Sequence, residues 1–339
     1  MNVTRLLTMC HPNGYGWQGT VAALFLSCLG VGTGCSMVSV PFVGGGEEPR
    51  TAFQQLAHLE VSSDRLYQAI VDQADIVGYS RQLQLESDLA APFTPSDMER
   101  VSEVFRRSLK VMLFDVAPDR FWDRHLASYY ASTLSEAEAR ALVESYDRMV
   151  RLPLSRVQEL RQAFVSDHLR DLLPEVRTRS SRFTVSTQAM MPTLFPGDHL
   201  IVDQTAYETA QPGRGDIVLF RFPDDQGPFL IYRVIGVPGD QVHITDQRVS
   251  VNGEVLPEPY IQHMDERIQA GTVRDRLGPV RVQPDHYFVM GDNREWSLDS
   301  RFLGAISREA IIGRAVLIYW SVDPGTQIPR WEHLNQSVQ

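Results

Sequence analysis

The sequence predicts an α+β protein built from successive parts of different character. These are an N-terminal membrane or lipid anchor segment (residues 1–46), a helical bundle domain (51–177), an all-β domain of antiparallel sheets (183–325) and a C-terminal tail (326–339). Three observations carry the prediction: an uncharged apolar run near the N-terminus, a long stretch with helical periodicity and few glycines, and then short strands separated by turns. With 339 residues, 43% of them hydrophobic, the chain can bury a core in each of two domains.

The first segment is predicted to direct the chain to a membrane. Between Arg5 and Glu47 no side chain carries a formal charge apart from His11, and Thr20–Val43 is apolar or small throughout. The run Gly34-Cys35-Ser36 resembles a lipoprotein processing site, at which Cys35 would be lipidated. A lipid anchor at Cys35, an uncleaved transmembrane helix and a released signal peptide are the alternatives. Each places the remaining chain outside the cytoplasm, and we expect a bacterial envelope protein whose domains face the periplasm.

Composition narrows the classes of partner and cofactor. The net charge of -10 and the absence of a basic patch argue against nucleic acid. The three cysteines all lie within the first 35 residues, and no cluster of histidines has the spacing of metal ligands, so we expect neither a metal nor another cofactor. Of the 32 basic residues only Lys110 is a lysine.

The helical domain is predicted from capped helix starts followed by apolar stripes. Thr94-Pro95-Ser96-Asp97 and Ser135-Glu136-Ala137-Glu138 both have the pattern of a helix N-terminus, and the apolar positions that follow them are expected to be core. The isolated histidines His58, His125 and His168 form no catalytic constellation. We therefore expect this domain to serve in interaction or spacing.

The β domain is predicted from many short strands without helices between them. Turns such as Pro196-Gly197-Asp198 and Pro238-Gly239-Asp240 separate the strands. The expected strands are Phe183–Ser186, His199–Val202, Asp216–Phe222, Phe229–Val237, Gln241–Ile244, Arg248–Val251, Tyr287–Met290 and Ile311–Trp320.

Five motifs in this domain resemble, in order, those of bacterial type I signal peptidases, the serine-lysine peptidases of family S26. They are Ala189-Met190-Met191-Pro192-Thr193-Leu194, Pro196-Gly197-Asp198, Arg214-Gly215-Asp216-Ile217-Val218, Arg233-Val234-Ile235-Gly236-Val237-Pro238-Gly239-Asp240, and Gly291-Asp292-Asn293-Arg294-Glu295-Trp296-Ser297-Leu298-Asp299-Ser300-Arg301. The resemblance covers Phe183 to about Val322. It implies a signal-peptidase-like β domain that acts on signal peptides of exported proteins.

The resemblance also implies a catalytic serine and lysine, and this sequence has neither at the matching positions. The serine, which attacks the peptide carbonyl, is replaced by Ala189, and the lysine, which takes its proton, is replaced by Tyr232. Alanine has no nucleophilic atom, and a phenol with an ordinary pKa near ~10 is protonated at neutral pH. No other lysine lies in the domain, since Lys110 precedes it.

Supporting positions of the family are present. The resemblance assigns Thr187 to an oxyanion hole, together with the backbone amide of Ala189, and assigns Ser297, Asp299 and Arg301 to orienting the base and bracing its turn. An ion pair between Asp299 and Arg301 that simply holds the fold is the alternative. Trp296 stands where a small polar residue is more usual.

Three functions follow from these residues. The first is a membrane-anchored pseudoprotease that binds extended, signal-peptide-like segments without cutting them. The second is an active signal peptidase with rewired residues, in which Ser186, Thr187 or Ser297 would work with His199, His243, His263 or His286. The third is a structural envelope lipoprotein in which the helical domain makes the functional contacts.

Overall fold

The computed structural model of the protein describes residues 50–74, 78, 80–81, 83–84, 89, 91–116, 121–148, 151–221, 228–261 and 272–338. The predicted anchor segment and Cys35 lie outside these residues. Within the described chain no helix is both long enough and apolar enough to cross a bilayer. The chain forms two compact units, one from residues up to 83 and 117–177, the other from 84–116 and 178 onward.

The first unit is helical. Its core is formed by side chains such as Leu56, Leu66, Tyr130 and Phe164, all almost completely buried. The helix start predicted at Ser135 is confirmed, because the Ser135 amide and hydroxyl donate to Glu138 at 2.8 and 2.6 Å. The helices are α1 (Ala52–Ser62), α2 (Arg65–Asp72), α5 (Phe121–Thr133), α6 (Glu136–Arg148), α7 (Arg151–Asp167) and α8 (Leu169–Arg177).

Helix α4 (Pro95–Lys110) belongs to the second unit. The start predicted for it is confirmed: Thr94 and Asp97 cap it reciprocally, with Pro95 in its first turn. Its buried stripe, which includes Val101 and Phe105, packs against strand β11 (Ile311–Ser321), and a π-helical turn, η3 (Val111–Asp115), continues it. The compact units therefore divide the chain differently from the predicted ranges, because an amphipathic helix does not reveal in its sequence which surface it covers.

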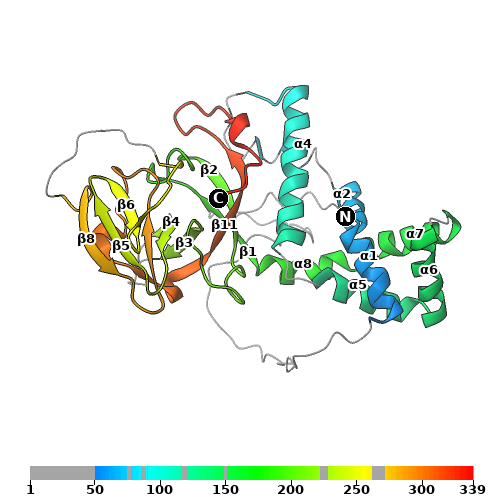
Figure 1. Ribbon diagram of the computed structural model, residues 1–339. Coiled ribbons are helices and arrows are strands. Elements are labelled where there is room, and N and C mark those ends of the chain that lie inside the picture. The colour runs from blue at the N-terminus through cyan, green and yellow to red at the C-terminus, as the bar shows by residue number, and fades with distance from the viewer. Residues whose placement is uncertain are drawn as a thin grey trace, which may run out of the picture. The chain divides into compact units, whose positions relative to one another are not determined.

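A seven-stranded antiparallel sheet forms the centre of the second unit (Figure 1). Its strand order is β1-β2-β11-β3-β4-β9-β10, so β1 and β10 are the edges. The strands are β1 (Ser180–Thr184), β2 (Asp198–Asp203), β3 (Ile217–Arg221), β4 (Phe229–Gly236), β9 (His286–Met290), β10 (Ile306–Ser307) and β11. Short helical segments accompany it: α9 (Ser300–Leu303), η4 (Arg308–Ala310) and η5 (Trp331–His333).

A second antiparallel sheet has the order β7-β6-β5-β8. It comprises β5 (Gln241–Thr245), β6 (Arg248–Val251), β7 (Glu254–Val255) and β8 (Arg276–Arg281). Strands β4 and β9 serve both cores, because their side chains alternate between faces. Val234 and Val289 lie in the core of the seven-stranded sheet, while Ile235 and Phe288 pack with the second sheet. Helices combined with antiparallel sheets bear out the α+β class, and all eight predicted strands are present to within a few residues.

Candidate functional site

Ala189 lies in the turn that leads from edge strand β1 toward β2. Residues 186–188 are exposed, whereas Ala189 is only 4% exposed. Asn293 fastens this turn: its backbone amide donates to the Ala189 carbonyl at 3.0 Å, and its side-chain amide donates to the Gln188 carbonyl at 3.0 Å. Thr187, assigned to an oxyanion hole by the resemblance, lies on the exposed part of the same turn.

Tyr232 fills the position at which the resemblance implies a lysine. It lies on β4, 4% exposed, in the same hydrophobic core as Ala189, with its ring 5.7 Å from that of Phe220. Its hydroxyl donates to the Leu298 carbonyl at 3.1 Å. Burial, with a smaller contribution from the negative charge of Asp299, raises the pKa of Tyr232 to about 12. The group is therefore a protonated donor at neutral pH.

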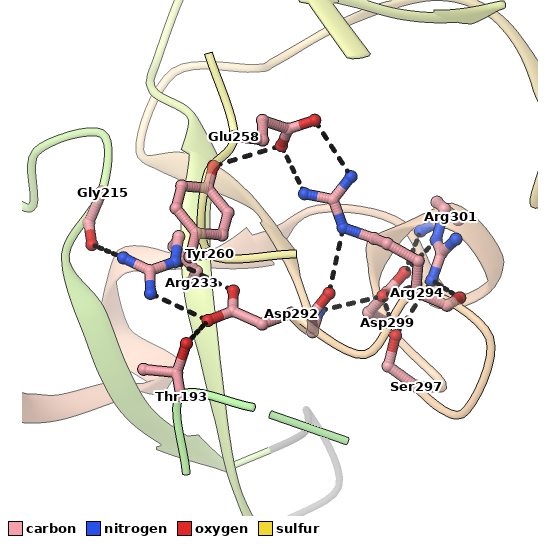
Figure 2. Close-up of polar contacts among 11 residues, drawn as sticks. Thr193, Gly215, Arg233, Glu258, Tyr260, Asp292, Arg294, Ser297, Asp299 and Arg301 are labelled. Carbon is pink, nitrogen blue, oxygen red and sulfur yellow. Dashed lines mark hydrogen bonds and ion pairs between the residues drawn. The ribbon is translucent and has the colours of Figure 1, made fainter. Parts of the chain in front are cut away.

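Ser297, Asp299 and Arg301 lie together in one buried cluster (Figure 2). The Ser297 hydroxyl donates to Asp299 Oδ2 at 2.5 Å and accepts from Arg301 Nη2 at 2.9 Å. The Arg301 guanidinium also donates to Asp299, through Nε to Oδ1 at 2.9 Å and through Nη2 to Oδ2 at 2.9 Å. The Ser297 hydroxyl is therefore buried, 3% exposed, and hydrogen-bonded to both members of the ion pair.

Gly291 joins the turn of Ala189 to the loop of Ser297. A Cβ atom built on Gly291 would lie 2.4 Å from the Ala189 carbonyl oxygen and 2.4 Å from Ser297 Cβ. Real Cβ atoms do not approach so closely, so only glycine fits without movement. The Gly291 amide donates to Asp299 Oδ2 at 3.1 Å. The separation of the two segments is set by this close backbone contact.

A second buried ion pair lies beside the first. Arg233, which follows Tyr232 on β4, forms a two-pronged pair with Asp292, with distances of 2.9 Å from Nε to Oδ1 and 2.8 Å from Nη2 to Oδ2. Thr193, on the turn that follows Ala189, donates to the same carboxylate at 2.5 Å. Arg233 also donates to the Gly215 carbonyl at 3.0 Å (Figure 2). Through Asp292, the pair links β4 to the loop of Ser297 and to the turn that follows Ala189.

Sequence reasoning missed Glu258 and Tyr260, which complete this network. Glu258 forms a buried ion pair with Arg294, whose Nε donates to the Gly291 carbonyl at 3.1 Å. The Tyr260 hydroxyl donates to Glu258 at 3.1 Å, and its ring lies 3.9 Å from the Arg233 guanidinium (Figure 2). Both come from the segment after β7, outside every motif, so nothing in the local sequence pointed to them.

The histidines considered as alternative bases make other contacts. His199 Nδ1 lies 3.1 Å from the Thr184 hydroxyl, His243 Nε2 lies 3.3 Å from the Thr245 hydroxyl, and His286 Nδ1 lies 2.8 Å from the Pro284 carbonyl oxygen. His263 lies outside the described residues. In the part of the chain that the structure describes, none of these three histidines is hydrogen-bonded to Ser186, Thr187 or Ser297.

The loop around Ser297 places its polar side chains inward and its apolar side chains outward. Ser297 and Asp299 are buried, while the side chains on either side of Ser297, Trp296 and Leu298, are 69% and 59% exposed. Arg301 helps to hold the loop, because its Nη2 donates to the Arg294 carbonyl at 2.6 Å. A rigid loop therefore presents two large apolar side chains next to the site.

Comparisons with known proteins match part of this chain to signal peptidases. Residues 177–320 match the family model described as signal peptidase, peptidase S26. The signal peptidase I of Leptolyngbya laminosa is 40% identical over 146 residues, which cover 41% of this chain and 68% of that protein. The chain belongs to the S26 signal peptidase family. Signal peptidase I V of Bacillus subtilis is 36% identical over 138 residues, 39% of this chain and 80% of that protein.

The family match covers the β elements and leaves two regions of the chain outside it. A solved signal peptidase I from Enterococcus faecalis is 29% identical, covers 31% of this chain and 96% of its own, and has a TM-score of 0.26. Most of the helical elements precede the match, and everything after residue 320 follows it. The residues outside the match are thus 1–176 and 321–339.

Proposed function

We propose that this chain is a non-cleaving member of the S26 family that binds extended, signal-peptide-like segments of exported proteins. The observation that carries the proposal is that the two positions of the chemistry hold Ala189 and Tyr232, while the side chains around them remain packed and hydrogen-bonded. Neither an attacking hydroxyl nor an amine able to accept its proton is present at these positions. The packed and hydrogen-bonded side chains around these positions would keep a peptide-binding surface in a fixed geometry.

The environment of Tyr232 supports the loss of chemistry. A general base must be unprotonated and free to accept a proton. The pKa of Tyr232, raised by burial to about 12, keeps its proton on at neutral pH, and that proton already points at the Leu298 carbonyl. Ser297, the other hydroxyl in the buried cluster, donates to Asp299. Rewired cleavage by Ser297 would therefore have to use a hydroxyl that is only 3% exposed, beside a carboxylate that is already paired with Arg301.

The edge of the seven-stranded sheet supports peptide binding. Strand β1 pairs with β2 through the register Ser180↔Asp203 to Thr184↔His199. It is an edge strand, so among the described residues no strand of this sheet pairs with its other side. A strand edge offers backbone donors and acceptors that an extended peptide can pair with. The chain beyond β1 continues through Thr187 to Ala189, so a segment added along this edge would reach the former reaction centre.

The location of the protein is part of the same proposal. The apolar run Thr20–Val43 would anchor the chain in the bacterial envelope, as a lipid-modified protein through Cys35 or as a transmembrane segment, with both units facing the periplasm. Segments of exported proteins would meet the site there. Membrane and exported peptide are thus the expected partners.

The deciding experiment compares cleavage and binding for one peptide. The full chain is incubated with a fluorogenic signal-peptide substrate beside Ala189→Ser, Tyr232→Lys and the double variant, and affinity is measured by fluorescence anisotropy with an uncleavable copy. We expect the natural chain and both single variants to bind without cleaving, and the double variant to gain activity. Cleavage by the natural chain would mean that another nucleophile acts; the absence of both binding and cleavage would remove the proposal altogether.

A further inference from the structure

Asp198 is a fully buried carboxylate at the start of β2, and the C-terminal tail supplies much of its surroundings. It is 0% exposed. Its Oδ1 accepts from the Ser321 hydroxyl at 2.5 Å, and its Oδ2 accepts from the Phe195 amide at 2.7 Å. The tail adds His333, whose Nδ1 lies 3.1 Å from Oδ2. A buried carboxylate needs such partners, because removing a charge from water is costly.

Arg330 fastens the tail to the turn that contains Asp198. Its Nη1 donates to the Pro196 carbonyl at 3.1 Å, to the Ser321 hydroxyl at 3.1 Å and to the Val322 carbonyl at 3.2 Å, and lies 3.7 Å from Asp198 Oδ1. Its Nη2 donates to Asp323 at 3.1 Å. One guanidinium thus joins the turn before β2 to the chain that leaves β11.

Aromatic packing strengthens the same attachment. The Phe195 ring lies 4.9 Å from the His333 ring and 5.4 Å from the Arg330 guanidinium. Gly197 adopts a positive φ of +89°, and a Cβ there would lie 1.9 Å from the Val322 carbonyl oxygen, so the turn is in direct backbone contact with the chain that leaves β11. The contact leaves little room for the turn to shift on its own.

The turn at residues 195–198 is hydrogen-bonded to the segment that is proposed to bind peptide. The Gly197 amide donates to the Val185 carbonyl at 2.8 Å, and the Val185 amide donates to the Asp198 carbonyl at 2.8 Å. Val185 is the residue at which the chain leaves β1 for Ala189. The contacts therefore run without interruption from the tail, through residues 195–198, to the peptide-binding edge.

We propose that Arg330 and His333 are positioning residues for the peptide-binding edge. By fixing the turn at residues 195–198, they hold residues 183–189 in the geometry that binds a peptide. Both lie beyond residue 320, where the family match ends. Their effect on peptide binding rests on the proposed function. Their effect on the edge segment itself does not.

The test measures those two effects separately on the full chain. Hydrogen exchange followed by mass spectrometry reports the protection of residues 183–198, and anisotropy reports the affinity for the uncleavable signal peptide. The variants are Arg330→Ala, His333→Ala and the double variant. Arg276→Ala is the matched control, because it removes an arginine from the exposed pair with Asp246 in the second sheet.

We expect exchange of residues 183–198 to quicken and peptide affinity to fall about tenfold in the double variant, the size of effect that losing hydrogen bonds to a charged group produces. Arg276→Ala should change neither. His333→Asn keeps a donor near the Nδ1 position and should restore most of the protection that His333→Ala loses. Arg330→Lys keeps the positive charge but loses the two-nitrogen geometry of the guanidinium. It should therefore restore less of the protection that Arg330→Ala loses.

The outcomes that overturn the inference are specific. Faster exchange confined to residues 328–338, with 183–198 unchanged, would mean that the tail only lies on the sheet. Equal acceleration across both sheets would mean that the residues stabilise the unit without positioning the edge. If the natural chain binds no peptide, the proposed function fails, and the exchange of residues 183–198 still decides whether the tail positions them. Should the double variant not fold, the single variants Arg330→Ala and His333→Ala, each compared with the natural chain and with Arg276→Ala, give the same comparison.

Discussion

The hydroxyl of Tyr232 donates a 3.1 Å hydrogen bond to the backbone carbonyl of Leu298 and so ties strand β4 to the loop that carries Ser297. In an S26 peptidase the resemblance implies an amine at this position that accepts a proton. Here the Tyr232 hydroxyl keeps its proton and donates a hydrogen bond to a backbone carbonyl. In this structure its contact is therefore a structural one.

Replacing Tyr232 with Phe should lower the free energy of unfolding by about 1 kcal/mol, because one partly buried hydrogen bond is lost while the ring remains. Urea unfolding of the full chain measures the change. Tyr129→Phe is the control, since the described side-chain contacts of Tyr129 are made by its ring, and it should change the free energy by less than about 0.5 kcal/mol. Equal losses in the two variants would contradict a structural role for the Tyr232 hydroxyl.

Gly291→Ala should destabilise the protein by about 1–3 kcal/mol, because the added methyl group would force apart the turn of Ala189 and the loop of Ser297. The methyl carbon would start 2.4 Å from the Ala189 carbonyl oxygen. Gly278→Ala, on β8, is the matched control: no atom lies within 4 Å of a Cβ built there. Thermal and urea unfolding give both values. A Gly291→Ala variant as stable as Gly278→Ala would mean that the two segments separate freely.

Arg233→Met should cost about 3–5 kcal/mol of stability, since it leaves the buried carboxylate of Asp292 without its cation. The side chains of the pair are 3% and 1% exposed. Arg276→Met breaks a pair whose side chains are 60% and 48% exposed, and should cost no more than about 1 kcal/mol. Urea unfolding at neutral pH compares the two, and similar losses would show that water reaches Asp292.

Stability should fall in acid through His199. Burial, reinforced by the positive charge of Arg182, lowers the pKa of His199 to about 4, against an ordinary value of ~6.5 in the unfolded chain. Between these values the unfolded state binds the proton more readily than the folded state. This contribution to stability is complete above pH ~6.5 and is lost as the pH falls toward about 4, at no more than ~1.4 kcal/mol per pH unit.

His199→Gln should therefore flatten the dependence of stability on pH between about 4 and ~6.5, the window set by the two pKa values. Urea midpoints at several pH values measure it. His286→Gln, which alters a ring hydrogen-bonded to the Pro284 carbonyl, is the control and should leave the slope in place. An unchanged slope in His199→Gln would assign the acid sensitivity to other groups.

The sequence predicted the strands better than it predicted which distant residues contact one another. Alternating apolar residues and glycine turns mark β2, β5 and β6 almost to the residue, because both signals are local. Strand β8 was missed: its residues are largely exposed, and Gly278 and Pro279 interrupt it. A strand with few buried side chains has no alternation of apolar and polar residues, so its sequence does not predict it.

Long-range partners could not be read from the chain at all. Ser297, Asp299 and Arg301 stand at every second position of one segment, and a motif marked them. Glu258 and His333 act through contacts 36 and 135 residues away, with Arg294 and Asp198. Such pairs form only after the sheets bring distant segments together, so the spacing of residues in the sequence does not predict them. The same reason explains why α4 was predicted as a helix but not as a cover for β11.

Trp296→Ala should weaken binding of a signal-peptide-like segment about tenfold while leaving the free energy of unfolding nearly unchanged. The indole is 69% exposed, so little packing is lost with it, yet it stands beside Ser297 on a loop that Arg301 holds in place. An exposed tryptophan on a rigid support can bury a large apolar area against a bound peptide at little entropic cost. Val255→Ala, which shortens a 64% exposed side chain on β7, is the control and should bind as the natural chain does. If Trp296→Ala keeps full affinity in the anisotropy measurement, the bound peptide does not cross this loop, and the binding edge would have to be confined to β1.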